Sequence, residues 1–337
     1  MRVGITFDLK DEYIAAGFTE EEVAEFDRPD TIRAIADALG ELGHAPEPIG
    51  NVKQLAARLV AGDRWDLVFN IAEGLYGFGR EAQIPALLDA WRIPYTFSDP
   101  MVLSLSLHKG MTKRVVRDCG VPTADFAVVE TVTDVGAIDL PYPLFAKPVA
   151  EGTGKGIGAA STVSSAQQLK TVCRDLLARY RQPVLVETYL PGREFTVGLV
   201  GTGREARALG VMEVLLGAAA EPGAYSYDNK AHFEGRVEYR LTEGELAHAL
   251  GQVALSAWRS LNCRDGGRID LRLDASGVPH FIEVNPLAGL NPEISDLAIL
   301  CRLNGIGYQA LIGMIVDSAL KRIDASAASR IADIEAA

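Results

Sequence analysis

Short apolar runs alternate with amphipathic stretches along the first hundred residues. Arg2–Phe7 and Trp65–Asn70 are mostly apolar, which is typical of strands buried on both faces. Pro29–Leu42 has apolar residues at helical spacing, begins with proline and is followed by Gly43. Strands that alternate with helices in this way predict a parallel sheet flanked by helices.

The stretch Asp8–Asp27 separates the first predicted strand from its helix and is rich in acidic residues. It is longer than most strand-to-helix connections, and long loops in compact domains are more often functional than neutral. A solvated surface excursion is the alternative interpretation.

The pattern changes at about Leu103. Amphipathic stretches then predict helices at His108–Cys119, Ala166–Tyr180 and Gly244–Leu261. Short apolar segments predict strands at Pro141–Pro148, Val184–Tyr189, Glu194–Val200 and Gly210–Leu215. A final helix is expected to end near Leu320, and the Ala- and Ser-rich residues 324–337 are expected to form a flexible tail.

Composition narrows the function classes. With 337 residues the chain is longer than most single domains and long enough to form two or three. Its net charge of −12 argues against nucleic acid or an anionic membrane as the main partner. No apolar run approaches the roughly 20 residues that span a bilayer, and no signal peptide is recognisable, so we expect a cytoplasmic protein. The four cysteines have no regular spacing, as expected for reduced thiols.

The most informative segment is 267–286, with the sequence GRIDLRLDASGVPHFIEVNP. Two alternating strands flank a turn of Asp, Ala, Ser and Gly, which predicts a β-hairpin. With Leu273 opposite Val278, Arg268 lies opposite Glu283. Side chains at every second position share a face. The predicted polar face carries Arg268, Asp270, Glu283 and Asn285, and the predicted core face carries Ile269, Leu271, Leu273, Ile282 and Val284.

Two carboxylates, one amide oxygen and one arginine share this polar face. Carboxylates this close repel each other unless a cation joins them, and hard oxygen ligands select Mg²⁺. An exposed, salt-bridged sheet face is the alternative. The loop NPLAGLNP directly after the second strand favours a site, because sites are built on loops at strand ends. We therefore expect Asp270, Glu283 and Asn285 to be metal ligands.

The glycine-rich segment Phe145–Gly158, FAKPVAEGTGKGIG, is a second candidate element. Its glycines leave the backbone free to approach an anion, and Lys147 and Lys155 bracket it. It is not a P-loop, because Lys155 is followed by glycine. It is not a GxGxxG fingerprint either, because Ile157 and Ala159 occupy the two positions open to the third glycine. A mobile surface hairpin is the alternative.

Four further residues are informative only in combination with these elements. Lys109 begins a basic helix and Lys230 lies in the polar loop YSYDNK, although a single lysine is more often solvated. Glu187 ends an apolar strand and Glu194 follows the turn LPGR, an arrangement that can hold an adenine edge and a ribose. A phosphate-binding loop, a magnesium hairpin and scattered lysines together indicate phosphoryl transfer from ATP.

These motifs resemble those of the D-alanine–D-alanine ligases and their ATP-grasp relatives. The resemblance extends from about Trp65 to Leu320 and includes FNIAEG, RIPYTFSD, LHKGMTKRVVRDCGVPT, FAKPVAEGTGKGI, VLVETYLPGREFTV, RIDLRLD and FIEVNPLAGLNP. It implies an α/β (α+β) ATP-grasp fold of three domains, a Rossmann-like parallel-sheet domain followed by two α+β domains that clamp ATP. The expected divisions are 1–103, 104–185, 186–323 and the tail 324–337.

The resemblance also implies which residues bind nucleotide and metal. Lys109 and Lys147 would contact the phosphates, Glu187 with the Tyr189–Leu190 backbone would read adenine, and Glu194 would bind the ribose. The implied nucleotide site comprises Lys109, Lys147, Glu151, Gly152, Thr153, Gly154, Lys155, Glu187, Tyr189, Leu190, Glu194 and Lys230. The three hairpin ligands would hold two Mg²⁺, for which Mn²⁺ could substitute.

Three residues would take part in catalysis by the same resemblance. Arg268 matches the arginine that faces the tetrahedral intermediate, and Lys230 matches the lysine of a mobile loop that reaches the γ-phosphate. Thr153 stands where the family's phosphate loop has a serine. ATP would phosphorylate a carboxylate, an amine would attack the acylphosphate, and Arg268 would stabilise the oxyanion.

The departures from the family lie in its amino-acid-binding segments. The GGxSxE segment is absent, and Glu25 and Asp27 lie near its position only by spacing. Glu73 stands where the ligases usually have histidine, Ala231 where they have tyrosine, and Ser295 is one place late. Substrate contacts are expected from Glu25, Glu73, Arg268, Gly289 and Ser295.

Acidic residues beside Ser295, namely Glu293 and Asp296, favour a substrate with an extra cation or one without a free carboxylate. The leading hypothesis is therefore an ADP-forming ligase that joins an amino acid or small carboxylate to an amine. Its partners would be small molecules, without nucleic acid or membrane, and a homodimer is allowed. The alternatives are a true D-alanine–D-alanine ligase of cell-wall synthesis and a non-catalytic nucleotide-binding regulator, which the retained Lys147, Lys230 and Arg268 disfavour.

Overall fold

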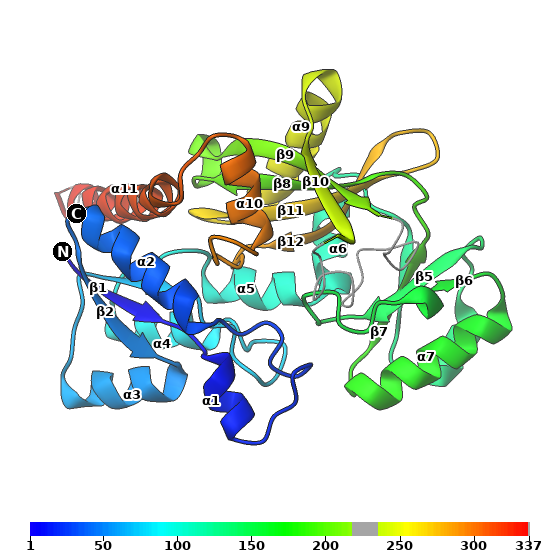
Figure 1. Ribbon diagram of the computed structural model, residues 1–337, viewed down its shortest axis with the longest axis horizontal. Helices are drawn as coiled ribbons and strands as arrows, with labels where there is room; N and C mark the ends of the chain where they lie inside the picture. Colours follow the sequence, from blue (N-terminus) through cyan, green and yellow to red (C-terminus); the bar gives the residue numbers. More distant parts are fainter. Residues whose placement is uncertain (218–234, 336–337) are drawn as a thin grey trace.

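The computed structural model describes residues 1–217 and 235–335, with side chains described up to residue 324. Three separate sheets organise this part of the chain, each with helices packed on it (Figure 1). The predicted α/β architecture with a parallel N-terminal sheet is confirmed.

The first sheet is parallel and has the order β2-β1-β3, formed by β1 (Arg2–Thr6), β2 (Ala45–Gly50) and β3 (Leu67–Asn70). The strand β2 was not predicted, because its sequence APEPIG contains two prolines. Proline cannot donate a ladder hydrogen bond and is therefore confined to edge strands, and β2 lies at the edge of this sheet.

Helices cover both faces of the first sheet. On one face α2 packs together with the C-terminal α11, and on the other lie α3 and α4 (Figure 1). The capping box of Asn51 and Gln54 starts α3. The helix bounds in this region are α1 (Lys10–Ala15), α2 (Pro29–Glu41), α3 (Val52–Ala61), α4 (Gln83–Trp91) and α5 (Pro100–Leu107).

The second sheet is antiparallel and has the order β4-β7-β5-β6. Its strands are β4 (Phe126–Val129), β5 (Leu144–Pro148), β6 (Thr162–Val163) and β7 (Val184–Thr188). The accompanying helices are α6 (Lys109–Asp118), α7 (Ala166–Tyr180) and the short η1 (Val132–Ala137) and η2 (Ala159–Ser161). The division predicted between residues 185 and 186 falls inside β7, so this sheet extends to Thr188. The other predicted divisions stay predictions.

The third sheet is antiparallel and has the order β10-β9-β8-β11-β12. Its strands are β8 (Glu194–Val200), β9 (Arg207–Leu216), β10 (Val237–Leu241), β11 (Gly266–Leu273) and β12 (Pro279–Asn285). The helices beside it are α9 (Gly244–Ser260), α10 (Asp296–Leu303), α11 (Tyr308–Glu335) and the short η3 (Gly203–Glu205). The backbone of α11 is helical to Glu335, whereas the sequence predicted that the helix ends near Leu320 and gives way to a flexible tail.

The register of the β11–β12 hairpin differs from the prediction. Arg268 lies opposite Asn285 and Asp270 opposite Glu283, not Arg268 opposite Glu283. Two features cause the difference. Leu273 pairs with Pro279 and not with Val278, and a bulge after Asp270 leaves Ile282 as an extra residue on β12, because Leu271 pairs with Phe281. The bulge turns Ile282 out of the predicted core face, and Phe281 is buried in its place.

A buried carboxylate fastens the third sheet to the N-terminal part of the chain. Asp265 is completely buried. Its Oδ2 accepts hydrogen bonds from the backbone N–H of Phe97 at 2.8 Å and from Arg322 at 2.7 Å, and its Oδ1 accepts one from Ser318 at 3.0 Å. One side chain thus joins the segment before α5, the start of β11 and α11.

Replacing Asp265 by asparagine is expected to lower the free energy of unfolding by about 3 kcal/mol, because it leaves Arg322 without its charged partner. Denaturant unfolding of wild type and variant measures the difference. Asp317→Asn, on the exposed side of α11, is the matched control and should stay within about 0.5 kcal/mol of wild type. A loss below 1 kcal/mol for Asp265→Asn, on this estimate of about 3, would contradict the fastening role.

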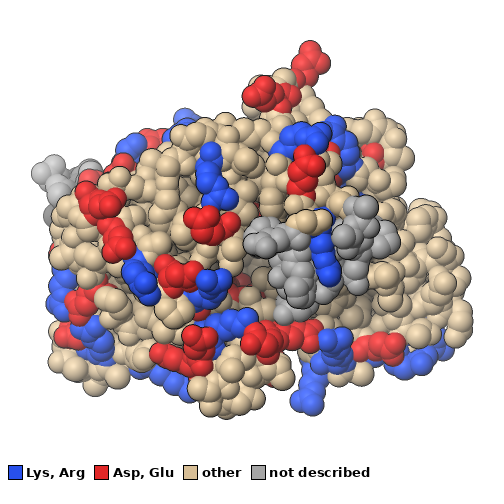
Figure 2. Space-filling view, in the orientation of Figure 1, with Lys and Arg blue, Asp and Glu red and all other residues tan. Residues whose placement is uncertain are grey.

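The outer surface carries no uniform sign of charge on the face seen in Figure 2, where acidic and basic side chains are intermixed. In the ranges that the structure describes, no single helix is long and apolar enough to cross a membrane. The pair Asp296–Leu303 and Tyr308–Asp324 reaches that hydropathy only as a combined, sharply bent segment, and both helices contribute side chains to a buried core.

Candidate active site

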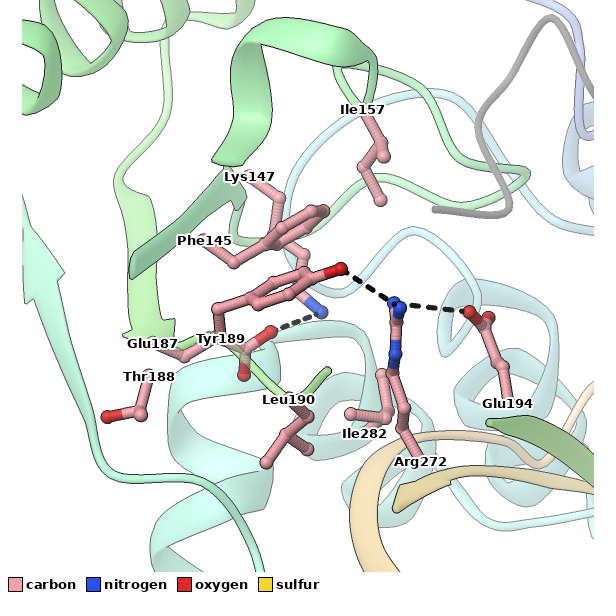
Figure 3. Close-up of a pocket in the computed structure, with 10 residues that line it drawn as sticks. All are labelled: Phe145, Lys147, Ile157, Glu187, Thr188, Tyr189, Leu190, Glu194, Arg272 and Ile282. Carbon is pink, nitrogen blue, oxygen red and sulfur yellow. Dashed lines mark hydrogen bonds and ion pairs between the residues drawn. The ribbon is translucent and has the colours of Figure 1, made fainter. Parts of the chain in front are cut away.

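A cleft lies between the second and third sheets. Its apolar lining includes the side chains of Phe145, Leu190 and Ile282, and Ile157 reaches in from the glycine-rich loop (Figure 3). The bulge in β12 is what presents Ile282 here. Apolar walls with a few polar groups at one edge are typical of a small-molecule site.

Glu187 lies at one edge of the cleft between two lysines. It is 4% exposed, and its carboxylate oxygens lie 2.9 Å from Lys147 Nζ and 2.8 Å from Lys113 Nζ. Burial alone would raise the pKa of Glu187, but the two ammonium groups outweigh it and lower that pKa to about 2. The carboxylate is therefore ionised and positions both lysines, and its predicted contact with adenine stays a prediction.

Lys113 is a residue that the sequence analysis missed. Its side chain is completely buried and also donates a hydrogen bond to Thr123 at 2.6 Å. It follows Lys109 by four residues, so the two lysines share one face of α6, and that spacing was the available signal.

A second polar group closes the other edge of the cleft. Arg272 lies between Glu194, 3.5 Å away, and the hydroxyl of Tyr189, 3.3 Å away (Figure 3). Its guanidinium also stacks over the Tyr189 ring at 5.2 Å. Glu194 and Tyr189 thus line the cleft as expected, and the arginine that orients them was not predicted.

The predicted metal ligands lie together on the hairpin. Asp270 accepts hydrogen bonds from Thr196 at 2.8 Å, from the amide of Asn285 at 3.3 Å and from Arg268. Glu283, opposite Asp270 across the hairpin, lies 3.3 Å from Lys109 Nζ. Two carboxylates and one amide oxygen in this space have the chemistry that suits Mg²⁺, so the donor set fits such an ion.

Arg268 is held between two carboxylates. It forms an ion pair with Asp270 and a longer one with Asp296 at 3.7 Å, and its side chain is only 12% exposed. Burial would lower the pKa of Arg268, but Asp270, Asp296 and Glu283 outweigh it and raise that pKa. A permanent positive charge is therefore fixed in place beside the donor set, and Asp296 is its unpredicted second partner.

The glycine-rich loop is anchored by the acidic N-terminal stretch. Oε1 of Glu25 accepts from the backbone N–H of Gly152 at 2.8 Å and lies 3.0 Å from Lys155 Nζ. Its Oε2 accepts from Arg80 at 2.9 Å. Lys155 also lies 2.5 Å from Glu151. Both oxygens of Glu25 thus anchor this loop. Glu25 also lines the cavity that contains Arg268, so its predicted substrate contact stays a prediction.

This anchoring predicts a pH dependence. Burial opposes ionisation, yet Arg80 and Lys155 lower the pKa of Glu25 to about 2, well below its value in the unfolded chain. A carboxylate whose pKa is lower in the folded than in the unfolded protein stabilises the fold at neutral pH. That contribution is lost as the pH falls toward 2 and the carboxylate is protonated. At pH 7 the free energy of unfolding of Glu25→Gln should therefore be about 3 kcal/mol lower than that of wild type. This difference should disappear as the pH falls from about 4.5 to 2.

Denaturant unfolding across that pH range tests the prediction. Glu21→Gln is the matched control, because Glu21 also bridges to the second sheet's helix but pairs with the exposed Arg179. Its effect should stay below about 1 kcal/mol. A difference between Glu25→Gln and wild type that does not change with pH would exclude the assigned role.

A separate cavity joins the hairpin to the connection between β3 and α4. It is lined by Arg268, Asn285, Gly289, Thr153 and, from the connection, Glu73. Ser295 is not among its lining residues, and its hydroxyl accepts a hydrogen bond from the backbone N–H of Asn291 at 2.9 Å within its own loop. The predicted substrate contact of Ser295 stays a prediction. Glu81, at the same connection, also lines it and was not predicted.

Within the glycine-rich loop, Thr153 has a left-handed backbone with φ of 50°, followed by Gly154 at 76°. Both residues contribute to the walls of the site. Lys230, and with it Ala231 and His232, lies outside the residues that the structure describes, so the predictions for that loop stay predictions.

Comparisons with known proteins identify the family. The family model described as the D-ala D-ala ligase C-terminus matches residues 115–317. A D-alanine–D-alanine ligase of Aquifex aeolicus is 33% identical over 288 residues, which cover 85% of this chain and 93% of that protein. The chain belongs to the D-alanine–D-alanine ligase family. The uncharacterised protein y4sG of Sinorhizobium fredii is 34% identical over 261 residues, which cover 76% of this chain and 75% of that protein.

Solved structures agree in fold with this family member. A D-alanine–D-alanine ligase of Bacillus anthracis complexed with ATP superposes with a TM-score of 0.72 at 19% identity and covers 97% of this chain and 99% of that one. The VanG D-Ala:D-Ser ligase of Enterococcus faecalis has a TM-score of 0.72 at 18% identity, covering 94% and 99% of the two chains. The predicted ATP-grasp fold is confirmed, and the chain is an ATP-grasp ligase of D-alanine–D-alanine ligase type.

Proposed function

We propose that this ligase couples the conversion of ATP to ADP with the joining of an amino acid, or another small carboxylate, to an amine. The observation that carries the proposal is the continuity of two sites. The apolar cleft opens into a polar recess with which it shares Lys147, Ile157 and Ile282. That recess in turn shares Lys109 and Glu283 with the cavity that contains Arg268. A phosphate donor and a carboxylate can therefore meet over the hairpin.

The proposed chemistry solves a leaving-group problem. A carboxylate is a poor electrophile, because its attack by an amine would have to expel oxide. In the proposed reaction a carboxylate oxygen attacks the γ-phosphorus of ATP, and the bond to ADP breaks. The amine nitrogen then attacks the acyl carbon of the acylphosphate, phosphate leaves with the carboxylate oxygen, and the nitrogen loses a proton.

Residues of this chain would orient the reactants and balance their charge. Lys147 and Lys109 lie where they can bind phosphate oxygens, and Glu187 and Glu283 hold their ammonium groups in place. Arg268, fixed by Asp270 and Asp296, would stabilise the oxyanion that forms when the amine attacks. Its buried position keeps that charge poorly screened by water.

Two Mg²⁺, or Mn²⁺ in their place, would be held by Asp270, Glu283 and Asn285, and when bound would neutralise negative charge on the phosphates. Thr196 supports this assignment, because its hydrogen bond orients Asp270 from behind, as outer partners of metal ligands commonly do. Asn285 would have to turn its amide oxygen toward the ion, since its nitrogen now donates to Asp270.

A specific substrate pair is the finer part of the proposal. The relatives named D-alanine–D-alanine ligase make D-alanine the first candidate. Glu73 disfavours it, because this position holds histidine in the family's usual FN…HG motif, and a carboxylate there changes the charge of the substrate cavity. A small amino acid or amine substrate is therefore proposed without fixing its identity, and the homodimer and the cytoplasmic location stay predictions.

The test is release of ADP and phosphate from ATP and Mg²⁺ with a panel of D-, L- and β-amino acids and amines, singly and in pairs. The proposal predicts release that depends on substrate, with formation of an amide product in equal amount. Activity with D-alanine alone would make the protein a true D-alanine–D-alanine ligase. Tight ATP binding without release for any pair would contradict the proposal and favour a non-catalytic regulator.

A further inference from the structure

Two carboxylates of the β3–α4 connection face the substrate cavity without a partner. Glu73 and Glu81 both line it, and Glu81 is only 9% exposed. Among the residues that the structure describes, neither carboxylate has a hydrogen-bond or ion-pair partner. Glu81 is buried and Glu73 is partly exposed. Carboxylates with little exposure are usually paired, so two unpaired ones that border one cavity favour a partner from outside the chain.

The cations around the same cavity are already taken. Arg80 pairs with Glu25 at 2.9 Å, and Lys109 pairs with Glu283 at 3.3 Å. The third, Arg268, pairs with Asp270. No charge in the described wall is left over to neutralise the carboxylates of the connection.

The connection itself is held rigidly. The backbone N–H of Gly74 donates to Asp8 at 2.9 Å, and a side chain at Gly74 would come within 2.5 Å of the Arg80 carbonyl oxygen. Arg80 in turn donates to the carbonyl of Ala150 at 3.0 Å. Glu73 and Glu81 flank this fixed segment, so the backbone that carries them is already ordered before a ligand binds.

Electrostatics agrees with a missing cation. Burial and the neighbouring Glu81 and Glu25 raise the pKa of Glu73 well above its ordinary value. Burial and Glu25 raise the pKa of Glu81 to about 7, although Arg80 and Lys109 act in the opposite direction. A positive charge placed beside them would therefore stabilise the ionised form of both carboxylates.

We propose that Glu73 and Glu81 form a subsite for an alkylammonium group of the substrate, one that takes no part in bond formation. An ammonium group has three donors and no acceptor, which matches two carboxylates that have no other partners. The substrate class is then basic: an amino acid with a side-chain amine, or a diamine as the amine substrate. This inference rests on the proposed function, and it departs from the relatives named for D-alanine, whose side chain carries no charge.

Paired probes distinguish the two sources of the ammonium group. Lysine and ornithine are compared with norleucine and norvaline as amino-acid substrates, and cadaverine is compared with pentylamine as the amine substrate. At neutral pH the charged member of at least one pair should have kcat/KM for ADP release at least about tenfold higher. Equal values within all pairs would overturn the subsite.

Variants show whether the two carboxylates cause the preference. Glu81→Gln and Glu73→Gln should each remove most of the preference for the charged probe, while kcat/KM for its neutral partner changes less than about threefold. Glu73→His, which restores the family's usual residue, should do the same. Glu41→Gln, on the exposed surface, should change neither value. A preference that survives in folded Glu73 and Glu81 variants would overturn the assignment.

Failure of the proposed ligase function can be distinguished from failure of the ammonium subsite. If no pair releases ADP, calorimetric titration of lysine and norleucine into the protein with ATP and Mg²⁺ still decides about the subsite. The subsite predicts binding of lysine that Glu81→Gln weakens about tenfold or more and that norleucine does not reproduce. No binding of any charged probe would overturn it. Release of ADP without charge preference refutes the subsite alone.

Discussion

Replacing Arg268 by alanine is expected to lower kcat for ADP-coupled amide formation about 100- to 1000-fold, the usual loss on removing one preorganised oxyanion donor. The physical reason is the fixed position of its charge. Arg268 is buried between Asp270 and Asp296, so water cannot replace it and no other described side chain occupies its place. Steady-state release of ADP with a substrate pair found in the panel measures the loss.

Folding must be followed in the same experiment, because the variant leaves two carboxylates without their cation. Arg268→Lys keeps the charge and should retain the fold while losing most activity, since an ammonium cannot reach both carboxylates and the oxyanion in the same geometry. Arg240→Ala is the control, since Arg240 pairs with Glu238 on the exposed strand β10. A folded Arg268→Ala protein within threefold of wild-type kcat, against the roughly hundredfold loss expected, would rule out the oxyanion role.

Replacing Asp270 by asparagine is expected to have the second largest effect. The change keeps the shape of the side chain but removes the charge that would hold a divalent cation and that pairs with Arg268. A metal contact worth several kcal/mol in the transition state corresponds to a loss in kcat of about 100-fold or more. The Mg²⁺ concentration for half-maximal rate should also rise at least about tenfold.

Asp274→Asn in the turn of the same hairpin is the matched control. Asp274 is partly exposed and accepts hydrogen bonds from the backbone of Ser276 and Val278, so its loss weakens the turn without reaching the cleft. Its kcat and Mg²⁺ dependence should stay near those of wild type. An unchanged Mg²⁺ requirement in Asp270→Asn would show that Asp270 is not a metal ligand.

The polar face of the hairpin could be predicted because alternation along a strand is a local property. Arg268, Asp270, Glu283 and Asn285 stay on one face in the structure as they did in the sequence. The register could not be predicted in the same way. It assumed a regular ladder, and one extra residue in β12 moved Ile282 from the expected core into the cleft. Bulges arise from packing on neighbouring strands, which a strand's own sequence does not record.

The partners of the site residues were beyond sequence reasoning, because they come from distant segments. Glu25 meets Gly152 and Lys155 only when the acidic stretch folds over the glycine-rich loop, across more than a hundred residues. Lys113 and Glu187 meet for the same reason. A sequence marks the residue types that chemistry needs, but which carboxylate neutralises which cation is decided by tertiary packing.

That distinction bears on two carboxylates of the cavity wall. Glu25, expected at the substrate, is engaged by the loop that it anchors. Glu81, which carries no motif of its own, is left facing the cavity. Glu25 and Glu81 differ in whether a described cation of that wall pairs with them, and this pairing is visible only in the three-dimensional structure.

Transfer of carboxylate oxygen to phosphate is the most direct test of the central claim, activation of a carboxylate by phosphoryl transfer. The carboxylate substrate found in the panel is labelled with ¹⁸O and turned over with ATP, Mg²⁺ and the amine. The account predicts ADP as the nucleotide product and one ¹⁸O atom in each phosphate released, seen by mass spectrometry or by the phosphorus NMR isotope shift. Unlabelled phosphate, or AMP with pyrophosphate, would contradict it.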